Sequence, residues 1–198
     1  MEHIQHLAKD KRLFRIIELQ QPYILEVRDK VYLRLCSSIL SQQLSTKVAK
    51  VLYQRFLDLF GEKEPTPKQI LATPVAVLRS LGFSNAKASY VHNVARFFVE
   101  NKITDAALYK MSNDEILELL TQIKGVGKWT VEMILMFTLG REDVFAIDDL
   151  GLKQSVIKLY KIKETNAKLL KEKILKISLK WSPYRTYACR YLWGWKDA

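Results

Sequence analysis

Apolar residues recur at helical spacing along most of the chain. Between residues 31 and 60 they lie mostly three or four positions apart, and Gly61 follows as a stop signal. The pattern predicts a long helical region over these residues. Its apolar members are Leu33, Leu35, Cys36, Ile39, Leu40, Leu44, Val48, Val51, Leu52, Phe56, Leu59 and Phe60.

Capping residues predict where the following helices begin. Thr66 and Thr73 each precede a proline, which suits the first helical position. Ser84 is expected to cap a further helix, and Ser112 with Glu115 forms a capping box before another. Later helices are predicted over residues 128–139, from 148–149, over 166–179 and from 182–183. The one short alternating segment, residues 23–27, is too weak to predict a strand, so the fold class is all-α.

Composition narrows the possible partners. The chain has 198 residues, of which 48% are hydrophobic, and its 32 basic and 21 acidic residues give a net charge of +11. This excess favours a polyanionic partner. No apolar run reaches the ~18 residues of a membrane span, and the first residues lack the apolar core of a signal peptide. Cys36 and Cys189 form no metal-ligand spacing, so we expect a reduced, intracellular protein.

A glycine turn joins two apolar helical patterns in LTQIKGVGKWTVEMILMF, residues 120–137. Gly125 and Gly127 lack a Cβ, so the backbone there can adopt unusual angles and approach a ligand closely. Amide groups at a helix N-terminus bind phosphate oxygens well. The segment therefore fits a helix-hairpin-helix that holds a nucleic-acid backbone. The alternative is an ordinary helix corner in which the two glycines only make a turn.

Two adjacent carboxylates follow an apolar strip in VFAIDDLG, residues 144–151. One of them is explained by an N-cap, and Asp148 is the candidate for that position. Asp149 would then lie in the first turn, where its carboxylate could face a cleft and stabilise positive charge or activate water. Both a structural and a catalytic interpretation are open for this pair.

Aromatic residues and glutamines supply two further candidate elements. Trp181, Trp193 and Trp195 lie near the C-terminus, and Trp129 is the fourth tryptophan. Such rings either pack in the core or stack on an unpaired base. Gln43 follows another glutamine inside the apolar pattern, where it is either a solvent-facing residue or one that fills the gap left by an extruded base.

Five segments, in this order, resemble the helix-hairpin-helix DNA glycosylase superfamily, and most nearly its 3-methyladenine glycosylase branch, the AlkA-like enzymes. They are ILSQQLSTKVA, LRSLGFSNAKASYVHNVA, IKGVGKWTVEMILMF, VFAIDDLGLKQ and WSPYRTYACRYLWGW. The resemblance spans nearly the whole chain and implies a compact form without the amino-terminal β-domain of larger bacterial members. It implies two helical lobes with a DNA-binding cleft between them, one at about residues 40–145 and the other at 1–39 plus 146–198.

The resemblance also implies roles for individual residues. Asp149 matches the catalytic aspartate, and Asp148 matches the neighbour that caps the helix. Trp129 stands where bifunctional members carry a lysine nucleophile, so no Schiff base is expected there. Trp193 matches an aromatic of the base pocket, which Trp129 is expected to line too. Gln43 matches the residue that plugs the duplex.

The hairpin residues take their expected roles from the same resemblance. DNA contacts are expected from Gly125, Val126, Gly127, Lys128 and Thr130. The backbone carbonyls of Thr121, Ile123 and Val126 match those that often hold a Na⁺ or K⁺ ion between hairpin and phosphate. No other cofactor is expected.

The implied activity is that of a monofunctional DNA glycosylase. It would flip out an alkylated purine of the 3-methyladenine type from double-stranded DNA and hydrolyse its N-glycosidic bond, leaving an abasic site. We expect a monomeric protein of the bacterial cytoplasm and nucleoid, or of the nucleus in a eukaryote. Three alternatives are a glycosylase for a deaminated, mismatched or oxidised base, a non-catalytic DNA-binding module, and a helical protein-interaction domain.

Overall fold

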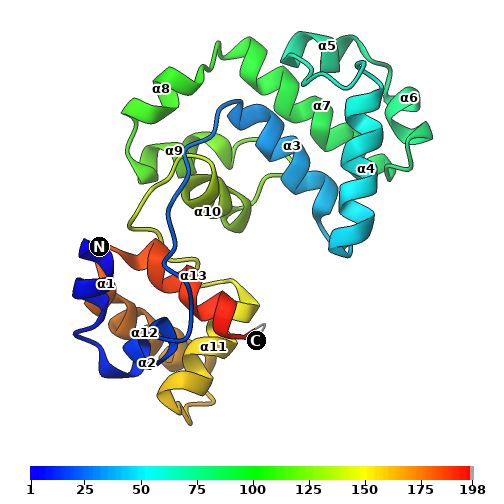
Figure 1. Cartoon of the computed structure of the whole chain (residues 1–198). Coiled ribbons are helices and arrows are strands. Elements are labelled where there is room, and N and C mark those ends of the chain that lie inside the picture. Colours follow the sequence, from blue (N-terminus) through cyan, green and yellow to red (C-terminus); the bar gives the residue numbers. More distant parts are fainter. Residues whose placement is uncertain (197–198) are drawn as a thin grey trace. The chain divides into compact units, whose positions relative to one another are not determined.

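Every regular element of the computed structural model, which describes residues 1–196, is a helix (Figure 1). The all-α prediction is therefore confirmed for this part of the chain. None of these helices is both long enough and apolar enough to cross a membrane. The helices are α1 Glu2–Leu7, α2 Lys11–Ile17, α3 Val31–Ser41, α4 Thr46–Asp58, α5 Pro67–Ala72, α6 Val75–Ser80, α7 Asn85–Glu100, α8 Asp105–Lys110, α9 Asn113–Leu120, α10 Lys128–Phe137, α11 Leu150–Tyr160, α12 Ala167–Ser178, the 3₁₀ helix η1 Leu179–Trp181 and α13 Arg185–Lys196.

The chain divides into two compact units. The terminal unit comprises Met1–Val27 and Leu135–Ala198, and the central unit comprises Arg28–Ile134. These boundaries differ from the expected ones near residues 40 and 145. Helix α3 belongs to the central unit because it packs on α4 and α7. The segment after α10 belongs to the terminal unit because the amide of Val144 donates to Oγ1 of Thr186, at 3.0 Å.

The core of the central unit forms around α7, which contacts α3, α5 and α6. Its buried residues recur every three or four positions, so they share one face of the helix. They are Ala88, Val91, Val94, Ala95 and Phe98. Helix α3 contributes a second apolar face to this core, formed by Val31, Leu33, Leu35, Cys36, Ile39 and Leu40.

The helical region predicted over residues 31–60 is confirmed, and the structure divides it into α3 and α4 with a turn between them. Gln43 lies in this turn with a left-handed φ of 58°. Ser45 caps α4 by accepting a hydrogen bond from the amide of Val48, at 3.4 Å. Leu44, Val48 and Val51 are 37–45% exposed, although the apolar spacing had placed them with the core.

Most predicted helix starts are confirmed. Thr66 and Ser112 each form a capping box, and Ser84 caps α7. Thr73 is an exception, because it ends α5 instead of starting the next helix. Helix α6 begins one residue later than predicted, after Pro74. Local capping chemistry therefore determines most of these boundaries to within one residue.

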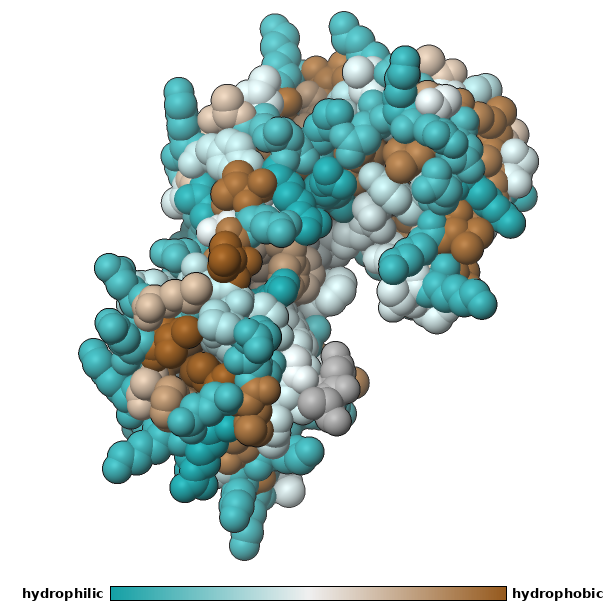
Figure 2. Space-filling model, viewed as in Figure 1, coloured by the Kyte–Doolittle hydropathy of each residue, from teal (hydrophilic) through white to brown (hydrophobic). Residues whose placement is uncertain are grey.

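The terminal unit packs α13 against α2 and α11. Trp181 and Tyr191 are its largest fully buried side chains. Asp10 links three of its elements: Oδ1 caps α2, while Oδ2 accepts hydrogen bonds from Oη of Tyr160 at 2.5 Å and Nε1 of Trp181 at 3.3 Å. Figure 2 shows hydrophilic side chains projecting from the visible surface between smaller hydrophobic patches.

Candidate functional site

The glycine turn lies in the central unit, between α9 and α10. Gly125 has a φ of 105°, which side chains rarely adopt. A Cβ at this position would also lie closer than 3.0 Å to ring atoms of Tyr90 on α7. Both observations make glycine the residue required at position 125.

Gly127 occupies a different environment at the start of α10. Its carbonyl accepts the first helical hydrogen bond, from the amide of Val131 at 3.1 Å. A Cβ at Gly127 would meet no atom within 4 Å. The first turn of α10 is therefore open at this point. An unobstructed helix start of this kind favours an anion.

Apolar side chains fix the turn from both sides. Ile123 and Val126 are buried before α10, and Val131 and Ile134 are buried within it. The amide of Val126 donates to the carbonyl of Ile123 at 2.9 Å. Because a carbonyl has two lone pairs, this bond leaves Ile123 with capacity for the expected Na⁺ or K⁺ ion. The ion and the contributions of Thr121 and Val126 remain predictions.

The residues after Gly127 differ in exposure. Trp129 is 41% exposed, so its ring is accessible from outside the central unit. The Nζ atom of Lys128 lies 3.8 Å from Oε1 of Glu132, one helical turn later. Thr130 is only 3% exposed as a whole residue, which leaves little surface for the expected DNA contact. Gln43 is exposed in its turn, as a residue that plugs a duplex requires.

The carboxylate turn lies in the terminal unit, immediately before α11. Asp149 is the N-cap of this helix, and its Oδ1 accepts a hydrogen bond from the amide of Leu152, at 2.7 Å. The same oxygen accepts a hydrogen bond from Nε1 of Trp193, at 2.9 Å. Two donors from different helices therefore fix the orientation of this carboxylate.

The prediction that Asp148 caps the helix is wrong. Its Oδ1 lies 2.8 Å from Nζ of Lys171, and both side chains are nearly half exposed. The sequence alone does not separate the two aspartates, because each has a side chain suited to capping. The helix begins one residue later than the Asp148 assignment required, and this places Asp149 at the cap.

Trp193 has a further contact besides its bond to Asp149. Its ring packs at 5.8 Å from that of Phe137. The guanidinium of Arg190 lies over the rings of both Phe137 and Tyr23, at 5.1 and 4.6 Å. The aromatic ring of Trp193 is evident from the sequence, but its hydrogen bond is not, because 44 positions separate it from Asp149.

Lys196 is a second residue that the sequence analysis missed. A Cβ at Gly151 would lie 3.1 Å from Nζ of Lys196 and 3.3 Å from Oδ1 of Asp149. The amine and the carboxylate therefore flank the space over Gly151. No local sequence pattern predicts this position of Lys196, because the lysine approaches from the last turn of α13.

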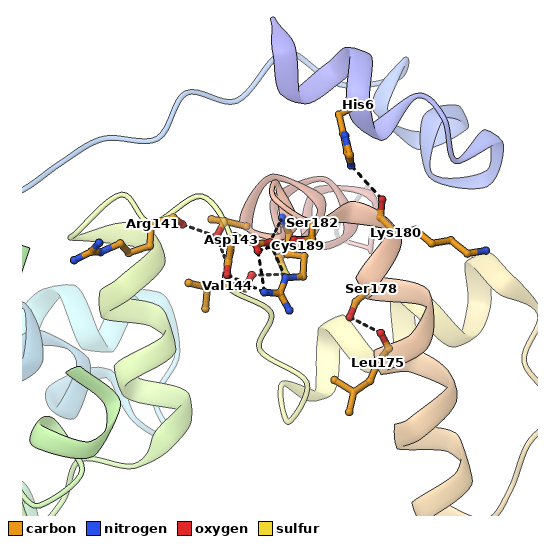
Figure 3. A network of polar contacts seen from close by, with 11 residues as sticks. His6, Arg141, Asp143, Val144, Leu175, Ser178, Lys180, Ser182 and Cys189 are labelled. Atoms are coloured by element: carbon orange, nitrogen blue, oxygen red, sulfur yellow. Dashed lines mark hydrogen bonds and ion pairs between the residues drawn. The ribbon is translucent and has the colours of Figure 1, made fainter. Parts of the chain in front are cut away.

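Asp143 anchors the segment that leads to the carboxylate turn. Its carboxylate accepts hydrogen bonds from Oγ of Ser182 at 2.8 Å and Nε of Arg185 at 2.6 Å (Figure 3). Burial raises the pKa of Asp143, but the hydrogen bonds from Arg185 and Ser182 outweigh it, and the pKa is lowered overall. The same contact raises the pKa of Arg185.

The predicted residues thus form two groups, one in each unit. The central unit holds the glycine turn with Lys128, Trp129 and the separate turn of Gln43. The terminal unit holds Asp149 bonded to Trp193. The base pocket expected from Trp129 and Trp193 together remains a prediction.

A model of the HhH-GPD superfamily of base excision DNA repair proteins matches residues 36–180. DNA-3-methyladenine glycosylase 1 of Schizosaccharomyces pombe is 34% identical over 194 residues, which cover 96% of this chain and 84% of that protein.

Solved structures agree with the sequence comparison. The 3-methyladenine DNA glycosylase of Schizosaccharomyces pombe, solved in complex with abasic DNA, matches with a TM-score of 0.85 and 31% identity, covering 100% of this chain and 98% of that one. A DNA-3-methyladenine glycosidase from Bacillus halodurans matches with a TM-score of 0.85 and 34% identity, covering 98% and 88%.

Proposed function

The chain belongs to the HhH-GPD superfamily of base excision DNA repair proteins, and from that premise we propose that it is a monofunctional DNA glycosylase for alkylated purines of the 3-methyladenine type. The observation that carries the proposal is the carboxylate of Asp149, held by Leu152 and Trp193 at the start of α11. Relatives named as 3-methyladenine glycosylases support the choice of lesion.

The first step is extrusion of the damaged nucleotide, since the glycosidic bond is inaccessible inside the base stack. Unstacking a nucleotide costs a few kcal/mol, and this cost is lowest for damaged bases. The open helix start after Gly127 receives a backbone phosphate and holds the duplex. Gln43, exposed on its turn, enters the space that the base leaves.

Hydrolysis then breaks the bond between C1′ and the base nitrogen. The electron pair leaves with the base, and the sugar becomes oxocarbenium-like. The Asp149 carboxylate lies where this positive charge develops and stabilises it. Water adds to C1′ and loses a proton, so the products are the free base and an abasic site.

The aromatic residues favour a positively charged base. An alkylated purine cation over an indole ring gains about 0.5–2 kcal/mol from cation–π attraction. Trp193 contributes such a face and also holds Asp149 through its Nε1. Trp129 offers an accessible second face. A cationic base is already a good leaving group, so this site needs little acid catalysis.

The family resemblance matches Trp129 to the position where bifunctional members carry a lysine nucleophile, and tryptophan cannot form a Schiff base. We therefore propose that the enzyme leaves the DNA strand intact. In this proposal the enzyme is a monomer that acts on the DNA inside the cell. A Na⁺ or K⁺ ion at the hairpin carbonyls of Thr121, Ile123 and Val126 is part of this proposal.

The test is release of bases from duplexes carrying 3-methyladenine, 7-methylguanine, hypoxanthine, uracil or 8-oxoguanine. We expect release of the two methylated purines and no covalent adduct after borohydride treatment. Faster release of uracil or 8-oxoguanine would overturn the lesion assignment. Failure to release any base, with DNA binding retained, would identify a non-catalytic binding module.

A further inference from the structure

Two adjoining cavities in the terminal unit are lined mainly by basic side chains. One has a volume of about 660 Å³ and the other of about 370 Å³, and Lys11 and Arg12 line both. We define the basic surface as the six cationic residues of the two linings, which are Lys9, Lys11, Arg12, Arg15, Lys161 and Lys180. They come from the start of the chain, from the end of α11 and from η1.

Little negative charge balances this surface. Within residues 1–196, none of the six forms an ion pair. Asp10 is the one carboxylate in the two linings. Its oxygens accept hydrogen bonds from two backbone amides, from Tyr160 and from Trp181, so they are committed to the fold. Six cations against one carboxylate leave an excess that attracts an anion.

Arg12 is held in place before any ligand arrives. Its Nη1 donates to the carbonyl of Tyr160 at 2.9 Å, and its guanidinium lies 5.5 Å from the centre of the Tyr160 ring. A guanidinium fixed in this way loses less side-chain entropy on binding, and its planar donors suit phosphate oxygens.

The end of a helix alone favours cations, and this accounts for part of the surface. Arg12 and Lys161 lie at the C-terminal end of α11, where the helix dipole attracts positive charge. Lys9 and Lys180 lie beyond the C-terminal ends of α1 and α12, so other helix ends attract them in part. Lys11 begins α2, and no helix end explains it. The exposed amines of these three lysines are available to a ligand.

The basic surface is separate from the carboxylate turn. Asp149 precedes α11, and Tyr160 ends it. Eleven helical residues span about 16 Å, at 1.5 Å per residue. At ~3.4 Å per phosphate along one DNA strand, this distance corresponds to about five nucleotides. One bound nucleotide therefore does not reach both places.

We propose that the basic surface binds the phosphodiester backbone of DNA away from the damaged nucleotide. Cations spread over two adjoining cavities suit a row of phosphates better than one small anion. The bound backbone belongs either to the flank of the duplex under repair or to a second DNA segment. The second arrangement would let the protein pass between segments during its search. This inference rests on the proposed function only for the identity of the nucleic acid.

Charge reversal at the three lysines of the basic surface that lie away from the end of α11 tests the proposal. The variant combines Lys9→Glu, Lys11→Glu and Lys180→Glu, and it leaves Asp10 and Arg12 intact. The control combines Lys163→Glu, Lys168→Glu and Lys173→Glu, exposed lysines of the same unit that line neither cavity. Both variants have the same net charge, so a general charge effect cancels.

The measurement is the slope of log K against log salt for a long undamaged duplex. This slope is negative, and each lost phosphate contact makes it shallower by about 0.9. We expect the slope of the test variant to be shallower than that of the control by about two to three. Equal slopes for the two variants would overturn the proposal. The proposal would also fail if the test variant bound inorganic phosphate or an acidic peptide more weakly than the control but bound DNA equally well.

Two further measurements identify which DNA is bound. If the flank of the same duplex is bound, the two variants differ on a long duplex and agree on a short one. If a second segment is bound, competitor DNA accelerates dissociation of the wild-type protein and of the control, but not of the test variant. Base release from a short alkylated duplex tests the proposed function separately. If the wild-type protein releases no base, the proposed function is contradicted and the slope comparison is unaffected.

Discussion

Two helix starts in this protein are built in opposite ways. Helix α10 begins after Gly127, which carries no side chain and has open space where a Cβ would lie. Helix α11 begins after Asp149, whose own carboxylate accepts the hydrogen bond from Leu152. The first start can receive an anion from outside, whereas the second already holds one. A phosphate suits the first site, and developing positive charge suits the second.

We call the start of α10 the open helix start and the start of α11 the filled helix start. The largest expected effect comes from the filled helix start. Asp149→Asn keeps a good capping oxygen, so the fold and DNA binding should persist. Loss of the charge should slow base release by about 10²–10³-fold or more. Single-turnover release from alkylated DNA measures this. Asp148→Asn is the matched control, because its exposed pair with Lys171 is worth at most about 1 kcal/mol. Undiminished release by Asp149→Asn would contradict the assignment.

The next effect separates the two glycines of the open helix start. Gly125→Ala forces a side chain into a left-handed backbone and against Tyr90, so it should destabilise the protein by about 1–3 kcal/mol. Gly127→Ala meets no atom and should leave stability unchanged. It should weaken DNA binding by about fivefold, or ~1 kcal/mol, for all sequences alike. Urea unfolding and binding to several duplexes check the pair. A sequence-selective loss would argue against backbone recognition.

A smaller effect is expected at Trp193. Trp193→Phe keeps an aromatic face but removes the Nε1 donor to Asp149. Base release should slow by about tenfold, since a hydrogen bond to a charged group is worth about 1.5 kcal/mol or more. Trp195→Phe is the control. If Trp193→Phe changed only the affinity for the damaged base, its hydrogen bond would not position the carboxylate.

The sequence predicted the open helix start better than the filled one. The two glycines and their apolar neighbours are adjacent in the chain, so spacing alone revealed a tight turn between helices. The filled start depends on tertiary contacts. Lys171 pairs with Asp148 from 23 positions away, and Trp193 bonds Asp149 from 44 positions away. A local capping rule does not include either partner, so it does not distinguish Asp148 from Asp149.

The break between α3 and α4 could have been predicted from the sequence. Ser45 is a good capping residue, yet the continuous apolar spacing outweighed it. In the structure Leu44, Val48 and Val51 are partly exposed, so their spacing does not report burial. Exposure depends on what packs against a helix, and a one-dimensional pattern lacks that information. The roles of Gln43 and Trp129 remain predictions for the same reason.

The smallest expected effect concerns the acid stability of the two turns. The pKa of Asp143 is lowered in the folded protein, so the folded state binds fewer protons than the unfolded state in the acidic range. The stabilisation is complete above the ordinary aspartate pKa and is lost as the pH falls through the folded value. Asp143→Asn should therefore flatten the fall of stability below about pH 4. It should cost about 1 kcal/mol at neutral pH, because the amide oxygen of asparagine can still accept a hydrogen bond from Arg185.

This pH effect should reach the filled helix start and spare the open one. Asp143 anchors the segment before Asp149 through Arg185 and Ser182, whereas backbone geometry and buried apolar side chains hold the glycine turn. Amide hydrogen exchange should therefore show faster opening near residue 149 in the variant, with no change near residue 127. Equal loosening at both places would mean that Asp143 stabilises the protein as a whole. Faster exchange near residue 149 alone would show that side-chain charge holds the start of α11 and that backbone geometry holds the start of α10.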